Sequence, residues 1–362
     1  MRLLISAGEA SGDAYAAALV QGLHSSNAPF ESITGIGGRK LAATGVPLLA
    51  DSSDWGAIGI LEAVRVGPRV YKQSRPMVRA LSQGPPGLFI PIDFGYLNVS
   101  LARSAKALGW KVLYFAPPGS WRRGKQGKHL PEITDAIVTQ FSWSAQLLKD
   151  AGANAHWFGH PLKEMLAEIV SPEARTGIAI LPGSRTHEVK YNLQAIIPAI
   201  AGLPGPFRVA VAASIDAGAL RAKWESMGGP TEVHWETQGA ARALASSRVA
   251  VVCSGTATLE AALVACPSVV VYRGSRLMEM EYRLRKPKFE FIALPNLLMQ
   301  REVVPELLQH QASPARIRHE LDSLLRNPEK QLAAFAELNE VLGPTEGISG
   351  AVKLAIDMAQ SA

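Results

Sequence analysis

Short apolar runs bounded by glycine, serine or acidic residues recur along the whole chain. The clearest covers residues 249–253, a continuous β-branched run typical of a strand buried on both faces. Residues 257–265 then show a helical pattern, and Thr256 is the expected N-cap. This rhythm of strand, small-residue turn and helix predicts an α/β fold with parallel sheets. Other strands are expected at residues 3–7, 33–36, 87–93, 111–116, 136–139, 177–182, 207–212, 231–235, 268–272 and 289–294, and helices at 14–23, 98–108, 144–151, 315–325, 329–342 and 348–359.

A polar, proline-bearing stretch at residues 171–176 interrupts this rhythm and is the best linker in the chain. A chain of 362 residues is also long for a single core. We therefore expect two α/β domains of similar size, residues 1–170 and 177–342.

Composition narrows the class of partner. The net charge of +6 favours phosphate-bearing or membrane-surface partners, but no basic block is interleaved with aromatic residues, as nucleic-acid binding would need. Cys253 and Cys266 lie in apolar runs and are read as reduced core residues, which implies a reducing cytoplasm. The N-terminus does not resemble a signal peptide, and no apolar run reaches the roughly 20 residues that span a bilayer. The expected protein is soluble or peripheral to a membrane.

Two turns in the second half are candidate anion sites. Ser254-Gly255-Thr256 joins a buried strand to a helix, so free N–H groups and the helix dipole would point at a bound anion. Glu260 lies one turn further and is suited to the hydroxyls of a ribose. The alternative is an ordinary strand–helix unit with a surface glutamate. Gly183-Ser184-Arg185 is the second such turn, and its guanidinium would bind phosphate without a metal ion.

The first half offers carboxylates at the ends of strands. Glu9 lies between Gly8 and Gly12, where open α/β sheets place their ligands, with Ser11 or Asp13 as cap of the next helix. The alternative is a simple loop.

Asp93 ends a buried strand and is our first candidate for a general base, with capping of the helix at residues 98–108 as its alternative. The basic, aromatic loop at residues 117–125 is either a phosphate contact or surface. Gly59 and Glu62 have no obvious packing role.

The sequence lacks the motifs that are typical of several common enzyme classes. The sequence has no Asp-x-Asp pair, no His/Cys cluster, no Walker lysine, no nucleophile elbow and no complete Gly-x-Gly-x-x-Gly turn. No metal and no cofactor is therefore expected. The remaining features suit a metal-independent transfer from a nucleotide-activated donor held between two Rossmann-like domains.

Motifs in order along nearly the whole chain resemble those of lipid-A-disaccharide synthases. They are Ala7-Gly8-Glu9-Ala10-Ser11-Gly12-Asp13, Gly35-Ile36-Gly37-Gly38, Phe158-Gly159-His160-Pro161-Leu162, Leu181-Pro182-Gly183-Ser184-Arg185 with Glu188, Ser254-Gly255-Thr256-Ala257 with Leu259-Glu260, Tyr272-Arg273, and Leu294-Pro295-Asn296-Leu297-Leu298 with Arg301 and Pro305-Glu306-Leu307-Leu308-Gln309.

The resemblance implies an inverting GT-B glycosyltransferase, with a cleft between its domains and a C-terminal helix, residues 343–362, that packs back on the first domain. The implied donor is UDP-2,3-diacylglucosamine and the acceptor is 2,3-diacylglucosamine 1-phosphate (lipid X). It also implies peripheral attachment to the cytoplasmic face of the inner membrane, and a homodimer.

Residue roles follow from the same resemblance. Asp93, Glu9 and Arg185 are the implied catalytic residues. The implied UDP site is Gly183, Ser184, Arg185, Ser254, Gly255, Thr256, Glu260, Asn296 and Arg301, and the implied acceptor site is Gly8, Glu9, Ser11, Gly12, Tyr96, Trp121 and Arg122.

The chain departs from the family's pattern in its first half. The family's Ile-Asp-Ala-Pro-Asp-Phe-Asn keeps its first acid as Asp93, but Tyr96 replaces the second, which is thought to be the base. A neutral phenol is a poor base near pH 7. The Trp-rich loop is shortened to residues 117–122, and the Pro-Phe-Glu segment is altered at residues 141–144. Either Asp93 takes over as base, or the acceptor or the activity has changed. The alternatives are a GT-B-like UDP-sugar enzyme with another acceptor, an epimerase, or a non-catalytic UDP-sugar or lipid-binding relative.

Overall fold

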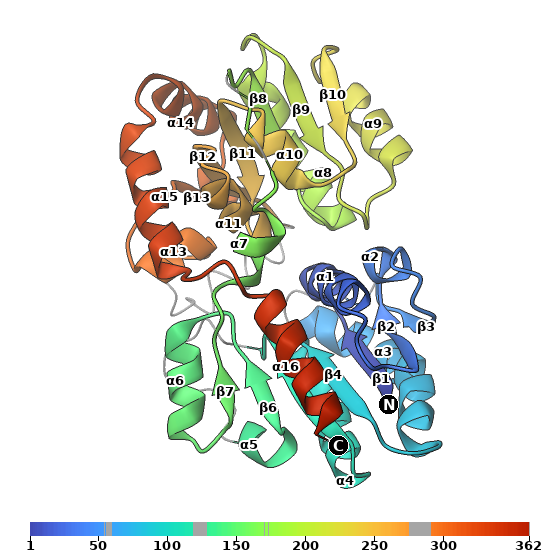
Figure 1. Ribbon diagram of the computed structural model, residues 1–362. Helices are drawn as coiled ribbons and strands as arrows, with labels where there is room; N and C mark the ends of the chain where they lie inside the picture. Colours follow the sequence, from blue (N-terminus) through green and yellow to red (C-terminus); the bar gives the residue numbers. More distant parts are fainter. Residues whose placement is uncertain are drawn as a thin grey trace. The chain divides into compact units, whose positions relative to one another are not determined.

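The computed structural model describes residues 1–53, 55, 60–118, 129–169, 171–172, 174–274 and 291–361, without the side chains of residues 60–66 and Tyr96. The chain divides into two compact units (Figure 1). One is Met1–Met165 together with Leu342–Ala362, and the other is Leu166–Val341. Each unit holds one parallel sheet, so both have the Rossmann-like architecture expected from the sequence.

The sheet of the first unit has the strand order β3-β2-β1-β4-β5-β6-β7, and all its described pairings are parallel. Its central strands are almost wholly buried, because helices cover both faces. The strands are β1 (Arg2–Ala7), β2 (Ser32–Gly37), β3 (Leu48–Asp51), β4 (Leu88–Ile92), β5 (Lys111–Phe115), β6 (Ala136–Val138) and β7 (Ala155–His156).

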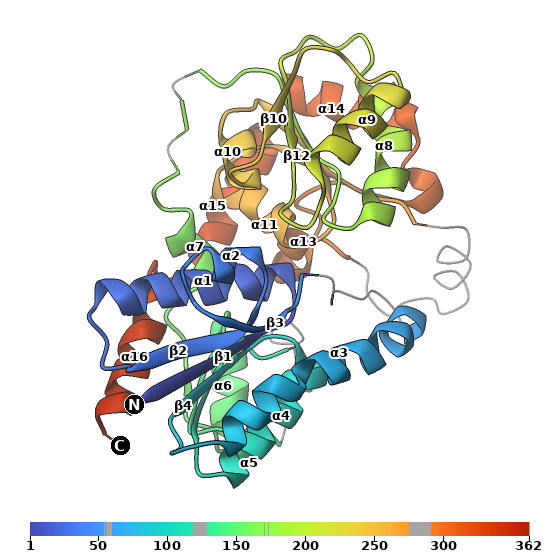
Figure 2. The ribbon, with the colours of Figure 1, turned by 90° about the vertical axis from the view of Figure 1, so that its right-hand side faces the viewer.

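Helices from both ends of the chain cover this sheet. Figure 2 shows α16 on one face, while α3 and α4 lie on the other. The helices are α1 (Ala10–Ser25), α2 (Arg39–Ala42), α3 (Ile60–Ser82), α4 (Gly95–Ala107), α5 (Leu130–Ile133), α6 (Ser142–Asp150), α7 (Pro161–Met165) and α16 (Ser349–Gln360).

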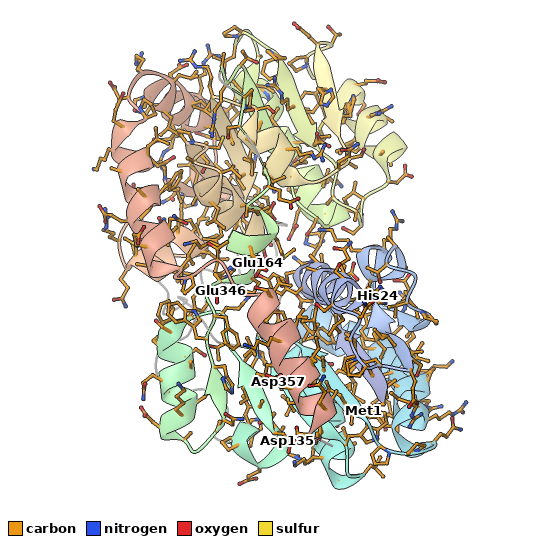
Figure 3. The ribbon with its side chains drawn as sticks, in the orientation of Figure 1. Met1, His24, Asp135, Glu164, Glu346 and Asp357 are labelled. Carbon is orange, nitrogen blue, oxygen red and sulfur yellow. The ribbon has the colours of Figure 1, made fainter. Side chains whose placement is uncertain are left out.

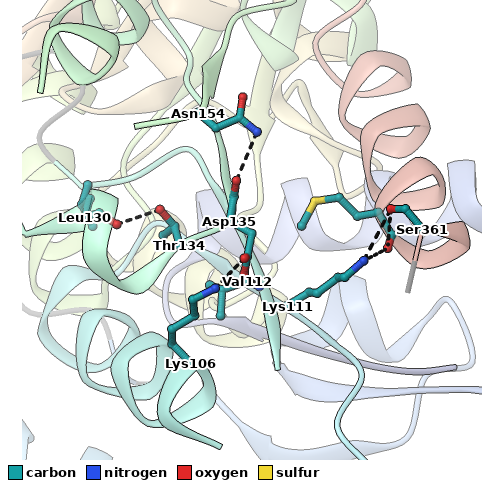
Figure 4. A network of polar contacts seen from close by, with 9 residues as sticks. Lys106, Lys111, Val112, Leu130, Thr134, Asp135, Asn154 and Ser361 are labelled. Carbon is teal, nitrogen blue, oxygen red and sulfur yellow. Dashed lines mark hydrogen bonds and ion pairs between the residues drawn. The ribbon is translucent and has the colours of Figure 1, made fainter. Parts of the chain in front are cut away.

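Side chains of the first unit make hydrogen bonds to backbone groups at both ends of α16. The carboxylate of Glu164 accepts hydrogen bonds from the N–H groups of Ile348 (2.7 Å) and Ser349 (3.1 Å) at the start of the helix, where Figure 3 labels Glu164. At the other end, the ammonium group of Lys111 on β5 donates to the carbonyl of Met358 at 2.9 Å (Figure 4). A carboxylate at the helix start and a cation at its end both complement the helix dipole. These contacts hold the last helix against the sheet.

The Phe-Gly-His-Pro motif holds the segment where the chain returns to the first unit. The N–H of His160 donates to the carbonyl of Leu342 at 2.9 Å. Burial lowers the pKa of His160 to about 3, so its ring is neutral and its Nδ1 accepts from the N–H of Leu162 at 3.2 Å. At Gly159, whose φ is +92°, a Cβ would lie 1.8 Å from the carbonyl oxygen of Pro344. The motif is therefore explained by packing.

Gly159→Ala is expected to destabilise the chain much more than Gly152→Ala. Both glycines lie at similar positive φ, +92° and +88°, so both substitutions carry the left-handed backbone cost of about 1–2 kcal/mol. No atom of the described residues lies within 4 Å of a Cβ at Gly152, whereas a Cβ at Gly159 meets the backbone of Pro344. Thermal unfolding of both variants isolates the packing term, and equal Tm values would contradict it.

The sheet of the second unit has the order β10-β9-β8-β11-β12-β13, again with parallel pairings. Its strands are β8 (Ile178–Leu181), β9 (Phe207–Ala210), β10 (Val233–Glu236), β11 (Val249–Cys253), β12 (Ser268–Tyr272) and β13 (Glu306–Leu308). Its helices are α8 (Thr186–Ile200), α9 (Ala217–Ser226), α10 (Ala240–Ala245), α11 (Thr256–Leu263), α13 (Leu294–Met299), α14 (Pro314–Arg326) and α15 (Glu329–Val341), with a short 3₁₀ helix at Gln309–Gln311.

Alternate residues of these strands face two different cores. Ile178 and Ile180 of β8 pack with residues of α8 and α14. Ala179 and Leu181, on the opposite face, pack with α10 and α11 in a smaller, alanine-rich cluster. Burial on both faces explains why these strands read as continuous apolar runs in the sequence.

One expected strand is wrong within the described residues. Residues 291–293 do not form a strand, and α13 begins at Leu294. Residues 289 and 290 are not among the described residues. Tertiary contacts decide this segment, because the carboxylate of Glu306 accepts the N–H groups of Ile292 and Ala293 at 2.9 Å each and so fixes the start of α13. The sequence also did not reveal β13, whose three residues include Glu306.

Candidate functional site

Each sheet has one point where the strand order reverses, and the candidate residues lie there. In the first unit the reversal falls between β1 and β4, which pair with Ala7 opposite Ile92. Glu9 follows β1 and Asp93 follows β4. Open parallel sheets bind ligands at such a point, outside the carboxyl ends of the strands. The fold thus brings the two carboxylates that the sequence singled out to one sheet edge.

The surroundings of Asp93 suit a general base. Burial and the nearby charge of Glu9 raise the pKa of Asp93 to about 7, so this carboxylate titrates close to neutrality. Its backbone is in the left-handed region at φ +48°, as is that of Phe94 at +45°. The alternative role as a helix cap is wrong, because α4 begins at Gly95 and no side chain caps it. Two successive non-glycine residues in this conformation indicate local strain at the site.

A buried amide joins the ends of the two strands. The Nδ2 of Asn98 donates to the carbonyls of Ser6 and Ile92 at 2.9 Å each, and its Oδ1 accepts from the hydroxyl of Ser6 at 2.6 Å. The hydroxyl of Tyr114 donates to the carbonyl of Asp93 at 2.9 Å. These bonds fix the backbone that carries Asp93. Sequence reasoning gave Asn98 no role, although it occupies the last position of the altered family segment.

An aromatic ring covers the glycine before Glu9. A Cβ at Gly8 would lie 2.2 Å from the ring of Phe94, and that ring also contacts Trp55, with ring centroids 6.0 Å apart. Gly8 is therefore required by the packing of Phe94. At Gly12 a Cβ would meet only ordinary contacts, the nearest at 3.6 Å from the Cβ of Ala7.

The expected turn after β1 is wrong in its extent. The helix α1 begins at Ala10, so Ser11, Gly12 and Asp13 lie in its first turns, and Glu9 is the N-cap residue without a side-chain cap bond. The small residues that suggested a longer turn therefore lie inside the helix.

Asp13 stabilises a different helix from the one expected. Its carboxylate accepts N–H groups at the start of α2, from Gly38 at 2.7 Å, Lys40 at 2.9 Å and Leu41 at 3.1 Å. Asp13 thereby ties α1 to the glycine-rich edge that follows β2.

In the second unit the strand order reverses between β8 and β11, which pair with Leu181 opposite Val252. The turn Gly183-Ser184-Arg185 follows β8, and Ser254-Gly255-Thr256 follows β11. Both expected anion sites are therefore neighbours at the same edge of the sheet.

A carboxylate of the protein itself accepts the N–H groups at the start of α8. Glu188 is 2% exposed, and its Oε2 accepts from the N–H groups of Ser184 (3.2 Å) and Arg185 (3.3 Å). Its Oε1 pairs with the guanidinium of Arg185 at 2.9 Å. This corrects the expectation that these N–H groups are available to a phosphate. The side chain of Arg185 remains 26% exposed.

The start of α11 has a different character. Its N-cap is Gly255 rather than the expected Thr256, and no side chain among the described residues caps it. Gly255 has φ +139°, and no atom of the described residues lies within 4 Å of a Cβ built there. Glu260 lies one turn further and is partly buried. The hydroxyl of Ser254 donates to the carbonyl of Ile292 at 3.3 Å.

Two residues of the expected UDP site are engaged elsewhere. Asn296 is fully buried; its Oδ1 accepts the N–H groups of Val303 and Val304, and its Nδ2 donates to Val304 and Glu306. The amide has no capacity left for a nucleotide, so Asn296 shapes its loop instead. Arg301 pairs with Glu337 of α15 and would have to leave that pair to reach a ligand.

Some expected site residues lie outside the description. They are Trp121, Arg122 and the side chain of Tyr96; Gly59 and the side chain of Glu62, which had no obvious packing role, also lie outside the described residues. His187 is a residue that the sequence did not single out: among the described residues its Nε2 is buried without a hydrogen-bond partner, two positions after Arg185. Among the same residues, no group of three or more acidic, histidine or cysteine side chains is placed to hold a metal ion.

The family profile of lipid-A-disaccharide synthetase matches residues 3–345. The chain belongs to this family. Family membership makes it a GT-B hexosyltransferase that acts in the synthesis of the lipid A disaccharide, as the resemblance of its motifs implied. The lipid-A-disaccharide synthase of Koribacter versatilis (strain Ellin345) is 34% identical over 358 residues, covering 94% of this chain and 92% of that protein. The synthase of Myxococcus xanthus (strain DK1622) is 33% identical, covering 99% and 97%.

Solved structures agree on the fold of this family member. The UDP-GlcNAc 2-epimerase of Neisseria meningitidis bound to UDP-GlcNAc has a TM-score of 0.61 at 12% identity, covering all of both chains. The calicheamicin glycosyltransferase has a TM-score of 0.57 at 14% identity, covering 100% of this chain and 98% of that one. At such low identity these likenesses concern the fold alone.

Proposed function

We propose that the chain condenses UDP-2,3-diacylglucosamine with 2,3-diacylglucosamine 1-phosphate, with inversion, to give the lipid A disaccharide 1-phosphate and UDP. Family membership supplies the reaction. The observation that carries the proposal for this chain is the carboxylate pair at the reversal point of the first sheet, where Asp93 has a pKa of about 7 beside Glu9. Asp93 would act as the base, although Tyr96 replaces the family's second acid.

The acceptor is assigned to the first unit. Asp93 would remove the proton from the 6-hydroxyl of the acceptor sugar, and that oxygen would attack the anomeric carbon of the donor. Glu9 would act on the pKa of Asp93 and contact acceptor hydroxyls together with Ser11. Buried bonds from Asn98 and Tyr114 hold Asp93 in place, as this step requires.

The donor is assigned to the second unit. The leaving diphosphate gathers negative charge as the glycosidic bond to UDP breaks. The guanidinium of Arg185 and the start of α11 at Gly255 would stabilise that charge, and Glu260 would accept the ribose hydroxyls. These groups supply positive charge without a metal ion, so we expect metal-independent transfer.

The direct test follows UDP release from UDP-2,3-diacylglucosamine with and without the acceptor, and identifies the product by mass spectrometry. We expect UDP and the disaccharide 1-phosphate only when both acylated sugars are present, and the same rate with excess EDTA. An epimerised donor, UDP release without acceptor, or binding of UDP without turnover would each contradict the proposal. Loss of activity in EDTA would contradict metal independence alone.

We also propose that the exposed face of α3 attaches the protein to an anionic membrane, where both acylated substrates reside. Between residues 64 and 92 the sequence has five basic and no acidic residues. The helix buries Val70, Met77 and Leu81, which leaves Lys72, Arg75 and Arg79 on the exposed side. Tyr71 (70%) and Val78 (45%) are also exposed there. Basic residues with an aromatic ring among them suit a lipid headgroup surface.

Lys72→Gln/Arg75→Gln/Arg79→Gln is expected to weaken binding to vesicles of phosphatidylglycerol and phosphatidylethanolamine about 100-fold, since each charge contributes about 1 kcal/mol. Co-sedimentation measures this. The control Arg316→Gln/Arg326→Gln/Lys330→Gln removes as many exposed charges from α14 and α15 and should bind as the wild type does. Equal loss in both triple variants would contradict α3 as the attachment face. No described helix is both long and apolar enough to cross a bilayer.

A further inference from the structure

Glu188 is a buried carboxylate at the centre of the donor half, and the mechanism above gives it no task. It is 2% exposed and lies between the ends of β8 and β11. A Cβ at Gly183, the residue after Pro182, would lie 2.8 Å from the Cβ of Glu188 and 3.4 Å from the sulfur of Cys253, the last residue of β11. Burial, and next the charge of Glu188, raises the pKa of the Cys253 thiol. The carboxylate therefore sits at the reversal point of the second sheet.

The polar contacts that Glu188 makes with other described residues all hold the Ser184-Arg185 turn. Two are the N–H groups of these residues, and the third is the guanidinium of Arg185 at 2.9 Å. Burying a carboxylate is costly, and three donors offset that cost here. The same contacts occupy N–H groups at the start of α8 and place negative charge there, which disfavours a bound phosphate at that start. Within the part of the chain that the structure describes, the start of α11 carries no such carboxylate cap.

We propose that Glu188 is a positioning residue for the transfer: it holds the guanidinium of Arg185 toward the leaving diphosphate and reserves the start of α11, rather than that of α8, as the diphosphate site. This inference rests on the proposed function, because it assigns Arg185 to a UDP leaving group. Glu188 acts through Arg185 and touches neither substrate. It therefore affects turnover more than nucleotide affinity.

The test is Glu188→Gln, which keeps the size and one acceptor oxygen but removes the charge that orients Arg185. We expect kcat to fall about 10- to 100-fold, since small displacements of a catalytic group have effects of this size, while the Kd of UDP changes less than about threefold. The control is Asp322→Asn, which removes the carboxylate of the Arg318–Asp322 pair in α14 and should leave kcat unchanged. Thermal unfolding verifies that both variants fold.

A double variant separates positioning from a merely structural role. If Glu188 acts through Arg185, then Glu188→Gln made in an Arg185→Ala background should change kcat by less than about twofold. An unchanged kcat in the single variant, or the full loss repeated in the Arg185→Ala background, would overturn the proposal. UDP binding that tightens tenfold in Glu188→Gln would overturn it too, because the start of α8 would then be the phosphate site. Failure of the wild type to form disaccharide would instead contradict the proposed function.

Discussion

Asp93→Asn is expected to lower kcat about 10²- to 10⁴-fold, the usual contribution of a general base, and at the same time to make the folded chain more stable. Asparagine cannot accept the proton of the acceptor hydroxyl. It does tolerate the left-handed backbone of this position, φ +48°, so the fold should survive. The pair of measurements is kcat with both acylated sugars and the Tm at neutral pH.

The gain in stability follows from the direction of the pKa shift. The folded-state pKa of Asp93 is raised from 3.8 to about 7, so between these values the folded chain holds a proton that the unfolded chain has lost. Stability therefore falls as the pH rises through this window, and above it the charged carboxylate costs the folded state free energy. Removing the charge should stabilise the chain by about 1–3 kcal/mol near pH 8, and by nothing below pH 4.

The wild-type kcat should rise with pH as Asp93 loses its proton, with a midpoint near 7. Glu9→Gln removes the neighbouring charge that helps raise this pKa, so the midpoint should move to lower pH.

Tyr96→Phe is the control for the family's usual base position and should keep kcat within a few-fold of the wild type. A large loss in Tyr96→Phe with little loss in Asp93→Asn would contradict the assignment of the base.

Arg185→Ala is expected to lower kcat about 10²- to 10³-fold, which is the usual effect of removing one group that stabilises charge in the transition state. It should also reduce the free energy of unfolding by about 1–3 kcal/mol, because Glu188 is left buried without its cation. Arg185→Lys keeps the charge but loses the planar fork, so it should fold normally and show an intermediate kcat. Near-normal turnover in Arg185→Ala would contradict the role given to this side chain.

The sequence predicted the parts of the fold that depend on burial alone. Residues 249–253 and 268–272 were expected as strands and form β11 and β12 with those bounds. Continuous β-branched runs leave little choice when both faces of a sheet are covered. The position of Asp93 at a strand end was likewise confirmed, because that strand is such a run.

The failures occur where long-range polar contacts decide the local structure. The residues around Leu294 do not predict that Glu306, which is distant in sequence, accepts the N–H groups before this helix and fixes its start. The Ser-Gly sequence after Glu9 is typical of a turn, yet Ser11 and Gly12 lie in the first turns of α1.

The same holds for the site. Asn296 matches a family motif and was expected to bind UDP, and Glu188 matches one without an assigned role, but the partners of both are other parts of the same unit. A motif shows that a side chain is needed, and only the fold shows what it binds.

The place of α16 in the chain has a consequence for biosynthesis. A ribosome must translate all of Leu166–Val341 before it makes this helix, although α16 packs on α1, β4 and β5 near the beginning of the chain. At normal elongation rates this delay is on the order of ten seconds or more. During that time the part of the nascent first sheet that α16 covers, over β4 and β5, stays exposed to solvent.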